Sequence, residues 1–162
     1  MAYLWTISEQ QAIKAFSANN AGRFDEIADI TQIKDLKPLI GFDFYQDLIQ
    51  NPATPANARL LDGDTYTYNG VTYEFKGLKY VLAYLWYANY VMSNMVDTFT
   101  GFVVKSNEDS QPASSGDKKN LRDINREVAM SHWEDCKNFL TVNSVDYPYF
   151  YFKRNVRKII TL

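Results

Sequence analysis

The sequence predicts a mainly α fold: a small helical bundle around a central apolar helix, with one β-hairpin insertion and an extended C-terminal tail. Three observations support this prediction. The segment from Tyr80 to Val96 carries no charge, so we expect it to be covered on every side. Apolar residues recur at helical spacing before and after this segment. Asn69-Gly70 separates two short segments of alternating polarity, as in a two-residue β-hairpin.

Length and composition bound the class of protein. A chain of 162 residues predicts one domain with a real core, at residues 1–146, followed by a tail at residues 147–162. The aromatic content of 15% is typical of an interface protein or of an aromatic core, and both interpretations stay open. A formal net charge of -2 argues against a dedicated nucleic-acid binder. One Cys excludes an internal disulfide, and the N-terminus lacks a signal peptide, so we expect folding in a reducing cytosol.

The first half of the chain is expected to be helical. Ser8 and Gln11 have the spacing of a capping box, with Ile7 as a hydrophobic staple, and this first helix would end near Phe16. Apolar spacing predicts a second helix from Phe24 to Leu36.

A break is expected after this second helix. Pro38 disfavours helical geometry at Lys37, and Gly41 adds a second interruption. A third helix is predicted over Phe42–Gln50, and a helical turn over Ala56–Leu61.

The hairpin at residues 65–76 is the sharpest local prediction. Asn69-Gly70 suits a type I′ turn, in which Tyr68 faces Val71 and Tyr66 faces Tyr73. This register places the aromatic residues and Phe75 on one side, which should lie on helices or on another subunit. The opposite side is polar and free to meet a neighbour; it consists of Thr65, Thr67, Thr72 and Glu74.

A long central helix is predicted from Leu78 to Phe99. Its uncharged part has only the minimum length for a membrane span and carries a heavy load of Tyr, Asn and Ser, so we expect protein to cover it. A short apolar piece, residues 102–104, and a polar loop at residues 105–116 follow.

Asp117 is expected to cap a last helix that runs to Leu140. The predicted core stripe of this helix consists of Leu121, Ile124, Val128, His132, Cys136 and Phe139.

The tail is aromatic and then basic, and Pro148 before a β-favouring run predicts an extended conformation. It could touch phosphate or an acidic partner surface, or its charges could simply keep the aromatic run soluble. Partner contact is the favoured interpretation, because tail aromatics without a partner would form an exposed apolar patch. The candidate interface residues in the tail are Tyr149, Tyr151, Lys153, Arg154, Arg157 and Lys158.

The sequence offers little catalytic chemistry. His132 and Cys136 are four residues apart on the last predicted helix, but the chain has no other His or Cys to complete a zinc site. Nothing marks Cys136 as an activated nucleophile, and no phosphate loop, dinucleotide fingerprint or nucleophile elbow is present. We therefore expect a non-enzyme with no catalytic residue, no cofactor and no metal.

Three segments carry a family resemblance. DLKPLIGFDFYQDLI (Asp35–Ile49), LLDGDTYTYNGVTYEFKGLKYVLAYLWYANYV (Leu60–Val91) and TGFVVKSNEDSQP (Thr100–Pro112) resemble head-tail connector, or ring, proteins of tailed phages of Bacteroides-type bacteria, crAss-like phages included. The resemblance runs in order over Ala12 to Leu140. The hairpin and the helix after it are its most specific part.

The resemblance implies a structural virion protein that forms a homo-oligomeric ring, commonly a dodecamer, between portal and tail. Its partners would be further copies of itself, the portal protein, other neck and tail ring proteins, and passing genomic DNA without sequence-specific binding. It would be located in the virion neck after assembly in the cytoplasm of the bacterial host. A soluble ligand-binding or regulatory module with an aromatic pocket is the alternative.

Overall fold

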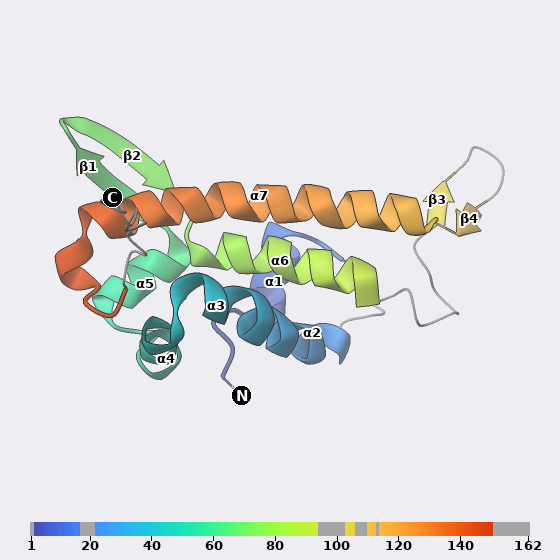
Figure 1. Ribbon diagram of the computed structural model, residues 1–162, viewed down its shortest axis with the longest axis horizontal. Coiled ribbons are helices and arrows are strands. Elements are labelled where there is room, and N and C mark those ends of the chain that lie inside the picture. The colour runs from blue at the N-terminus through green and yellow to red at the C-terminus, as the bar shows by residue number, and fades with distance from the viewer. Residues whose placement is uncertain (1, 17–21, 94–102, 106–109, 113, 151–162) are drawn as a thin grey trace, which may run out of the picture.

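The computed structural model describes residues 2–16, 22–93, 103–105, 110–112 and 114–150 (Figure 1). The described residues form a mainly helical body with the predicted β-hairpin, whose two strands have five residues each. The elements in chain order are α1 (Ile7–Ile13), α2 (Phe24–Ile30), the π-helix η2 (Thr31–Leu36), α3 (Lys37–Ile40), α4 (Phe42–Gln50), α5 (Pro55–Asp62), β1 (Asp64–Tyr68), β2 (Val71–Phe75), α6 (Leu78–Ser93), β3 (Val103–Lys105), β4 (Ser110–Pro112), α7 (Ser115–Val142) and the 3₁₀ turn η3 (Ser144–Asp146).

Helix α6 is the centre of the fold, as the uncharged segment predicted. It lies against α7 along its length, and α1, α2, η2 and α5 cover its other sides (Figure 1). Among its residues, Leu82 and Trp86 are fully buried, and the Trp86 indole N–H donates to the Phe24 carbonyl at 3.1 Å. The Phe24 ring also contacts Trp5 edge-on, with centroids 5.5 Å apart. The described helices include none that is long and apolar enough to span a membrane.

Helix α1 begins two residues earlier than the capping-box prediction placed it. Thr6, and not Ser8, is the N-cap: its hydroxyl accepts from the Glu9 N–H at 3.3 Å, and its own N–H donates to the Glu9 carboxylate at 2.7 Å. Glu9 also pairs with Lys79 of α6 at 2.6 Å. Because an acidic side chain at the third helical position completes the box, the Thr6/Glu9 pair takes the role assigned to Ser8 and Gln11. The helix ends at Ile13 instead of near Phe16.

The predicted break at Lys37 is wrong. Helix α2 passes into η2, whose last hydrogen bond runs from the Lys37 N–H to the Gln32 carbonyl, and Lys37 is itself helical at φ -55° and ψ -43°. Pro38 then lies in the first turn of α3, directly after the π-helical stretch. The break comes at Gly41, whose φ of 90° ends α3 and starts α4. Helix α4 has the predicted bounds.

Helix α7 starts at Ser115 with Ser114 as N-cap. Asp117 is the third helical residue, which completes the capping box, and not the cap. The predicted core stripe is displaced by about one residue. Ile124 is 48% exposed, whereas Asn125, Ala129 and Trp133 are buried together with Cys136 and Phe139. Asn125 tolerates burial because its amide donates to the Leu121 carbonyl at 2.6 Å.

Two further differences concern segments predicted to be irregular. β3 and β4 form a short antiparallel pair at the far end of α7 from the β1–β2 hairpin, within the stretch expected to be an apolar piece and a polar loop (Figure 1). Tyr147, assigned to the extended tail, is only 3% exposed and its hydroxyl donates to the Ala56 carbonyl at 2.6 Å. Phe150 packs on the Phe44 ring, with centroids 5.4 Å apart. Residues 147–150 therefore belong to the helical body.

Candidate functional site

The β1–β2 hairpin has the predicted turn and register. Tyr68 pairs with Val71 and Tyr66 with Tyr73, and Asn69 and Gly70 have positive φ angles of 51° and 78°. Asn and Gly reach these angles at little cost, so the turn chemistry fixes which side chains share a face.

The polar face of the hairpin is exposed as expected. Thr65, Thr67, Thr72 and Glu74 all lie at the surface. The hydroxyls of Thr67 and Thr72 are 3.4 Å apart across the two strands, and Glu74 forms a surface ion pair with Lys76 at 2.7 Å. The Lys76 ammonium holds the pKa of the Glu74 carboxyl below its usual range. The structure thus brings these four candidate residues together.

The aromatic face of the hairpin is covered only at its base. Phe75 is buried and stacks on Phe139 of α7, and Tyr66 meets the same ring edge-on at 5.7 Å. Towards the turn, Tyr68 and Val71 are each 52% exposed, and Tyr73 is 44% exposed. The helices of the same chain therefore cover only the lower half of the face that was expected to lie on helices or on another subunit.

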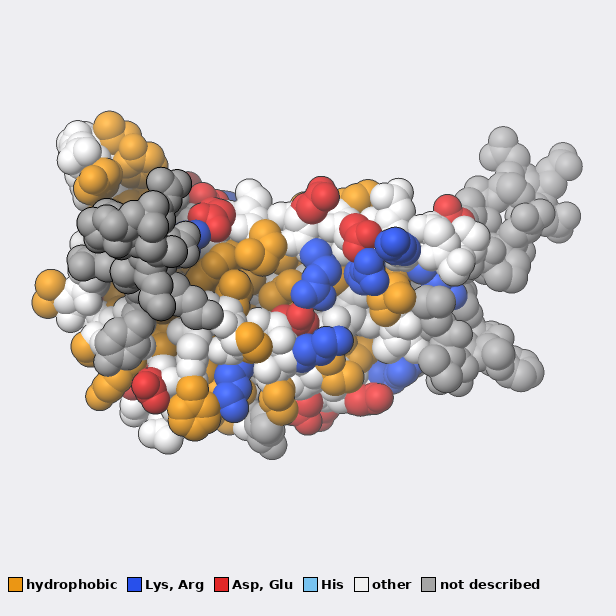
Figure 2. All heavy atoms as spheres, viewed as in Figure 1, with side chains coloured by type: hydrophobic (Ala, Val, Ile, Leu, Met, Phe, Trp, Pro, Cys, Tyr) orange, Lys and Arg blue, Asp and Glu red, His pale blue; other side chains and the backbone are white. Residues whose placement is uncertain are grey.

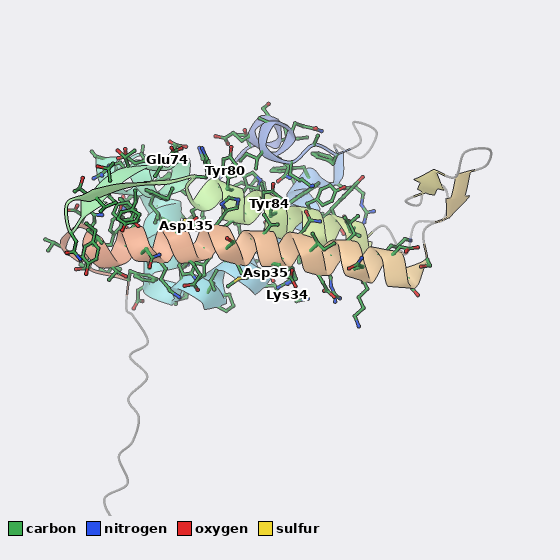
Figure 3. All side chains as sticks on the ribbon, turned by 90° about the horizontal axis from the view of Figure 1, so that it is seen from above. Lys34, Asp35, Glu74, Tyr80, Tyr84 and Asp135 are labelled. Atoms are coloured by element: carbon green, nitrogen blue, oxygen red, sulfur yellow. The ribbon has the colours of Figure 1, made fainter. Side chains whose placement is uncertain are left out.

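The uncovered half borders a depression that we call the hairpin groove. Its lining residues come from the hairpin and from the second half of α7: Tyr66, Tyr68, Tyr73, Glu74, Asp135, Asn138, Thr141 and Val142. The stacked rings of Tyr66 and Tyr73, with centroids 5.4 Å apart, form one wall. Figure 3 shows Glu74 and Asp135 on the hairpin side of α7, with Lys34 and Asp35 on the other side. The groove combines aromatic surface with two carboxylates.

A second depression, which we call the α4 groove, lies against a different face of α7. It is lined by Pro38, Leu39, Ile40, Gly41, Phe42, Asp43, Trp133, Lys137, Tyr149 and Phe150. Phe42 is 59% exposed and Tyr149 is 50% exposed, while Lys37 places its ammonium 4.7 Å from the Phe42 ring centroid. In Figure 2, hydrophobic side chains reach the surface at the hairpin tip and along the lower edge of the same end of the molecule.

Only one of the remaining predicted interface residues can be placed in a groove. Tyr149 borders the α4 groove, whereas Tyr151, Lys153, Arg154, Arg157 and Lys158 lie outside the described residues. Of the predicted candidates, the structure therefore locates the four on the hairpin and one in the tail.

The side chains of His132 and Cys136 are at least half-buried, away from open solvent. Cys136 is fully buried, and burial raises the pKa of its thiol to about 12. His132 is half-buried between the rings of Tyr80 and Tyr84, at centroid distances of 5.4 and 5.7 Å, and burial lowers its pKa. In the part of the chain that the structure describes, no three His, Cys, Asp or Glu side chains are close enough together to hold a metal ion.

Sequence reasoning missed the α7 walls of both grooves. Trp133 and Lys137 face the α4 groove, and Asp135 and Asn138 face the hairpin groove. The helical spacing of Trp133 and Lys137 was a signal that could have found one wall, but the prediction followed His132 instead. No sequence signal indicated that the hairpin would dock beside Asp135.

The chain matches one family model over well over half of its length. A model described as a family of unknown function (DUF6712) covers residues 36–158. The chain belongs to this family. All residues that line the two grooves fall inside the DUF6712 match. No curated protein and no solved structure matches the chain.

Proposed function

We propose that this DUF6712 member is a structural ring subunit of a phage neck, located between the portal and the tail. In this role it extends the DNA channel and provides a docking platform for the tail. Its partners are further copies of itself, the portal protein and other neck rings. The sequence resemblance over Asp35–Ile49, Leu60–Val91 and Thr100–Pro112 supports the proposal, since the family description assigns no function.

The observation that carries the proposal is the presence of two different aromatic surfaces on one subunit. A closed ring of identical chains is held by heterologous contacts, so each subunit must offer two unlike, complementary faces. The hairpin groove and the α4 groove use different sides of α7, and each exposes Tyr or Phe side chains. Aromatic residues are enriched at the centres of protein interfaces, because they bury a large area at low entropic cost.

The proposal assigns no catalytic residue, cofactor or metal. The Cys136 thiol is fully buried and protonated at neutral pH, so it cannot serve there as a thiolate nucleophile. The net charge of -2 suits a channel that DNA must slide through, because a strongly basic lumen would hold the phosphates.

Two measurements test the proposal. Electron cryomicroscopy of particles from the phage that encodes the chain should show it as a ring below the portal, and its absence from the neck would contradict the proposal. In solution with purified portal, twelve copies of the 18.7 kDa chain would form a ring of about 220 kDa. A chain that stays monomeric beside the portal yet binds a small molecule in either groove would instead support a ligand-binding module.

A further inference from the structure

Charge is divided unevenly along the chain. Residues 151–162 read YFKRNVRKIITL, with four basic residues and no acidic one. The other 13 basic residues and all 19 acidic residues belong to residues 1–150, which gives that part a formal charge of -6. The basic segment and the acidic remainder of the same sequence therefore carry opposite net charge and attract each other, within one chain or between two copies.

The hairpin groove offers the complementary chemistry. Of its eight lining residues, Glu74 and Asp135 are acidic and none is basic, although Glu74 already pairs with Lys76 at 2.7 Å. Tyr68 and Tyr73 present exposed rings, over which Lys and Arg side chains can lie. The chain already uses such contacts elsewhere, since the Lys14 ammonium lies 4.9 Å from the centroid of Tyr87 and the Arg59 guanidinium lies 5.4 Å from that of Phe139.

The α4 groove is less suited to this segment. Lys137 lines it, and Lys37 lies over the Phe42 ring at its edge, so both would repel a basic peptide. Asp43 is the only acidic residue among those that line it. The charges of the lining residues therefore favour the hairpin groove over the α4 groove as the binding site of the basic segment.

The position of Phe150 bears on which copy supplies the segment. Phe150 is the last described residue before the basic segment, and its ring packs on Trp133 at a centroid distance of 6.0 Å. Trp133 faces the α4 groove, whereas Asp135 faces the hairpin groove from another side of α7. The described chain thus ends on one face of α7 and the acceptor groove lies on another, an arrangement that fits a head-to-tail contact between neighbours. A segment of 12 residues is also long enough to reach its own groove, and the crosslinking below distinguishes the two.

We propose that residues 151–162 of one copy bind in the hairpin groove of the next copy. The basic side chains meet Glu74 and Asp135, and their stems lie on Tyr68 and Tyr73. This contact rests on the proposed ring function and names the interface that would hold the ring together. It assigns a role to the half of the aromatic face that the subunit's own helices leave exposed.

Crosslinking between two variants of the full chain, each with one added cysteine, tests the contact. One copy carries N138C, an exposed groove position on α7, and the other carries I160C in the basic segment. A short bismaleimide joins the two thiols, and because each chain has only one new thiol, a joined pair must come from two copies. Wild-type chain is the background control, since Cys136 is buried.

Charge-neutral variants define the specificity. Replacing Glu74 and Asp135 together (E74Q with D135N) should lower the crosslinking rate about fivefold at low salt, the effect of losing two exposed ion pairs. The matched control is E127Q, which removes the charge of an exposed acid on α7 outside both grooves. Raising the salt concentration should lower the crosslinking rate of the N138C/I160C pair in which Glu74 and Asp135 are intact, and leave that of the doubly neutral variant nearly unchanged.

The outcomes separate this contact from the ring function. A crosslink that depends on Glu74 and Asp135 supports the contact. A crosslink that forms only within a single chain carrying both added cysteines places the segment in its own groove and overturns the proposal. An equal loss of crosslinking rate in E127Q, or no crosslink in the assembled state, also overturns it. A chain found in the neck without this crosslink would retain the ring function and lose the contact. A specific crosslink in a chain absent from particles would do the reverse.

Discussion

The Phe75 ring, at the end of β2, stacks on the Phe139 ring of α7 with centroids 4.3 Å apart and 23° between the ring planes. Both side chains are buried. This contact joins residues 64 positions apart and fixes the hairpin to the second half of α7. An isolated two-stranded hairpin is marginal in water, so its stability depends on this attachment.

Phe139→Ala should therefore lower the free energy of unfolding by about 3–5 kcal/mol, because it leaves a cavity under both Phe75 and Tyr66. Urea denaturation followed by tryptophan fluorescence measures this change. Tyr68→Ala is the matched control: this half-exposed ring near the turn should cost less than about 1 kcal/mol. Equal losses for the two variants would show that the tip is also packed within the subunit.

A polar network joins η2, α6 and α7. The Asp35 carboxylate accepts from Arg126 at 2.7 Å and from the Asn89 amide at 2.7 Å. The Asp35 side chain is only 5% exposed, whereas that of Arg126 is 42% exposed. Removing Arg126 therefore leaves a buried charge, whereas removing the Asp35 charge leaves a partly exposed one.

Arg126→Ala should destabilise the protein more than Asp35→Asn. The first change leaves a buried carboxylate that, among the described residues, keeps the Asn89 amide as its hydrogen-bond donor, at a cost of about 3 kcal/mol. The second leaves a guanidinium that water can solvate, at about 1–2 kcal/mol. Thermal and urea unfolding of both variants give the order, and the reverse order would show that Arg126 contributes mainly through the packing of its stem.

The pH dependence of stability should carry the signature of His132. Its pKa in the folded protein lies below the ordinary 6.5, chiefly because the ring is buried and also because Lys76 is near, while Asp135 acts in the opposite direction. The unfolded chain then binds the proton more readily, so stability is full above about pH 6.5 and falls as the pH drops towards the folded-state pKa.

His132→Phe keeps a ring between Tyr80 and Tyr84 and removes the titration. Between about pH 7 and pH 5 the wild type should lose stability and this variant should lose less. The carboxyl groups with lowered pKa values, such as Glu9 and Asp64, titrate below their ordinary 4.5 and 3.8 and so contribute little in this range. Parallel curves for the two proteins would contradict the prediction.

The start of α1 gives a direct test of its N-cap. Thr6→Ala removes the hydroxyl that accepts from the Glu9 N–H and should cost about 1 kcal/mol. Ser8→Ala changes an exposed residue inside the helix and should alter the free energy of unfolding by less than about 0.5 kcal/mol. A larger loss at Ser8 would restore the original capping prediction.

Sequence patterns predicted best those elements whose residues permit only one local conformation or one position in the fold. Asn69-Gly70 fixed the hairpin register because few other residues tolerate two positive φ angles. The uncharged α6 had to be central, because no side of it could face water. Gly41 set the start of α4 because its positive φ angle of 90° ends the preceding helix.

Features that depend on distant contacts were not predictable in this way. The buried face of α7 includes Asn125 and leaves Ile124 exposed, which inverts the usual preference because Asn125 satisfies its own amide on the preceding turn. The hairpin groove exists only because Phe75 meets Phe139, and nothing local to either residue encodes that pairing. The sequence therefore indicated the hairpin residues of the candidate site and not its α7 wall.

Two truncations separate the roles of the C-terminal segments. A chain that ends at Phe150 keeps Tyr147, whose buried hydroxyl bonds to the Ala56 carbonyl, and the Phe150 ring against Phe44. Its free energy of unfolding should stay within about 0.5 kcal/mol of the wild type, because the described core is intact. A chain that ends at Asp146 loses both aromatic contacts and should be destabilised by at least about 3 kcal/mol.

Assembly should respond differently from stability. The chain ending at Phe150 should fold yet fail to form rings, because it lacks the basic segment that we propose to bind the neighbour. Light scattering measures its mass directly. If this chain still assembles, the ring is held by other surfaces, such as the α4 groove. If it loses as much stability as the chain ending at Asp146, residues 151–162 contribute to the fold of their own subunit and not to a neighbour.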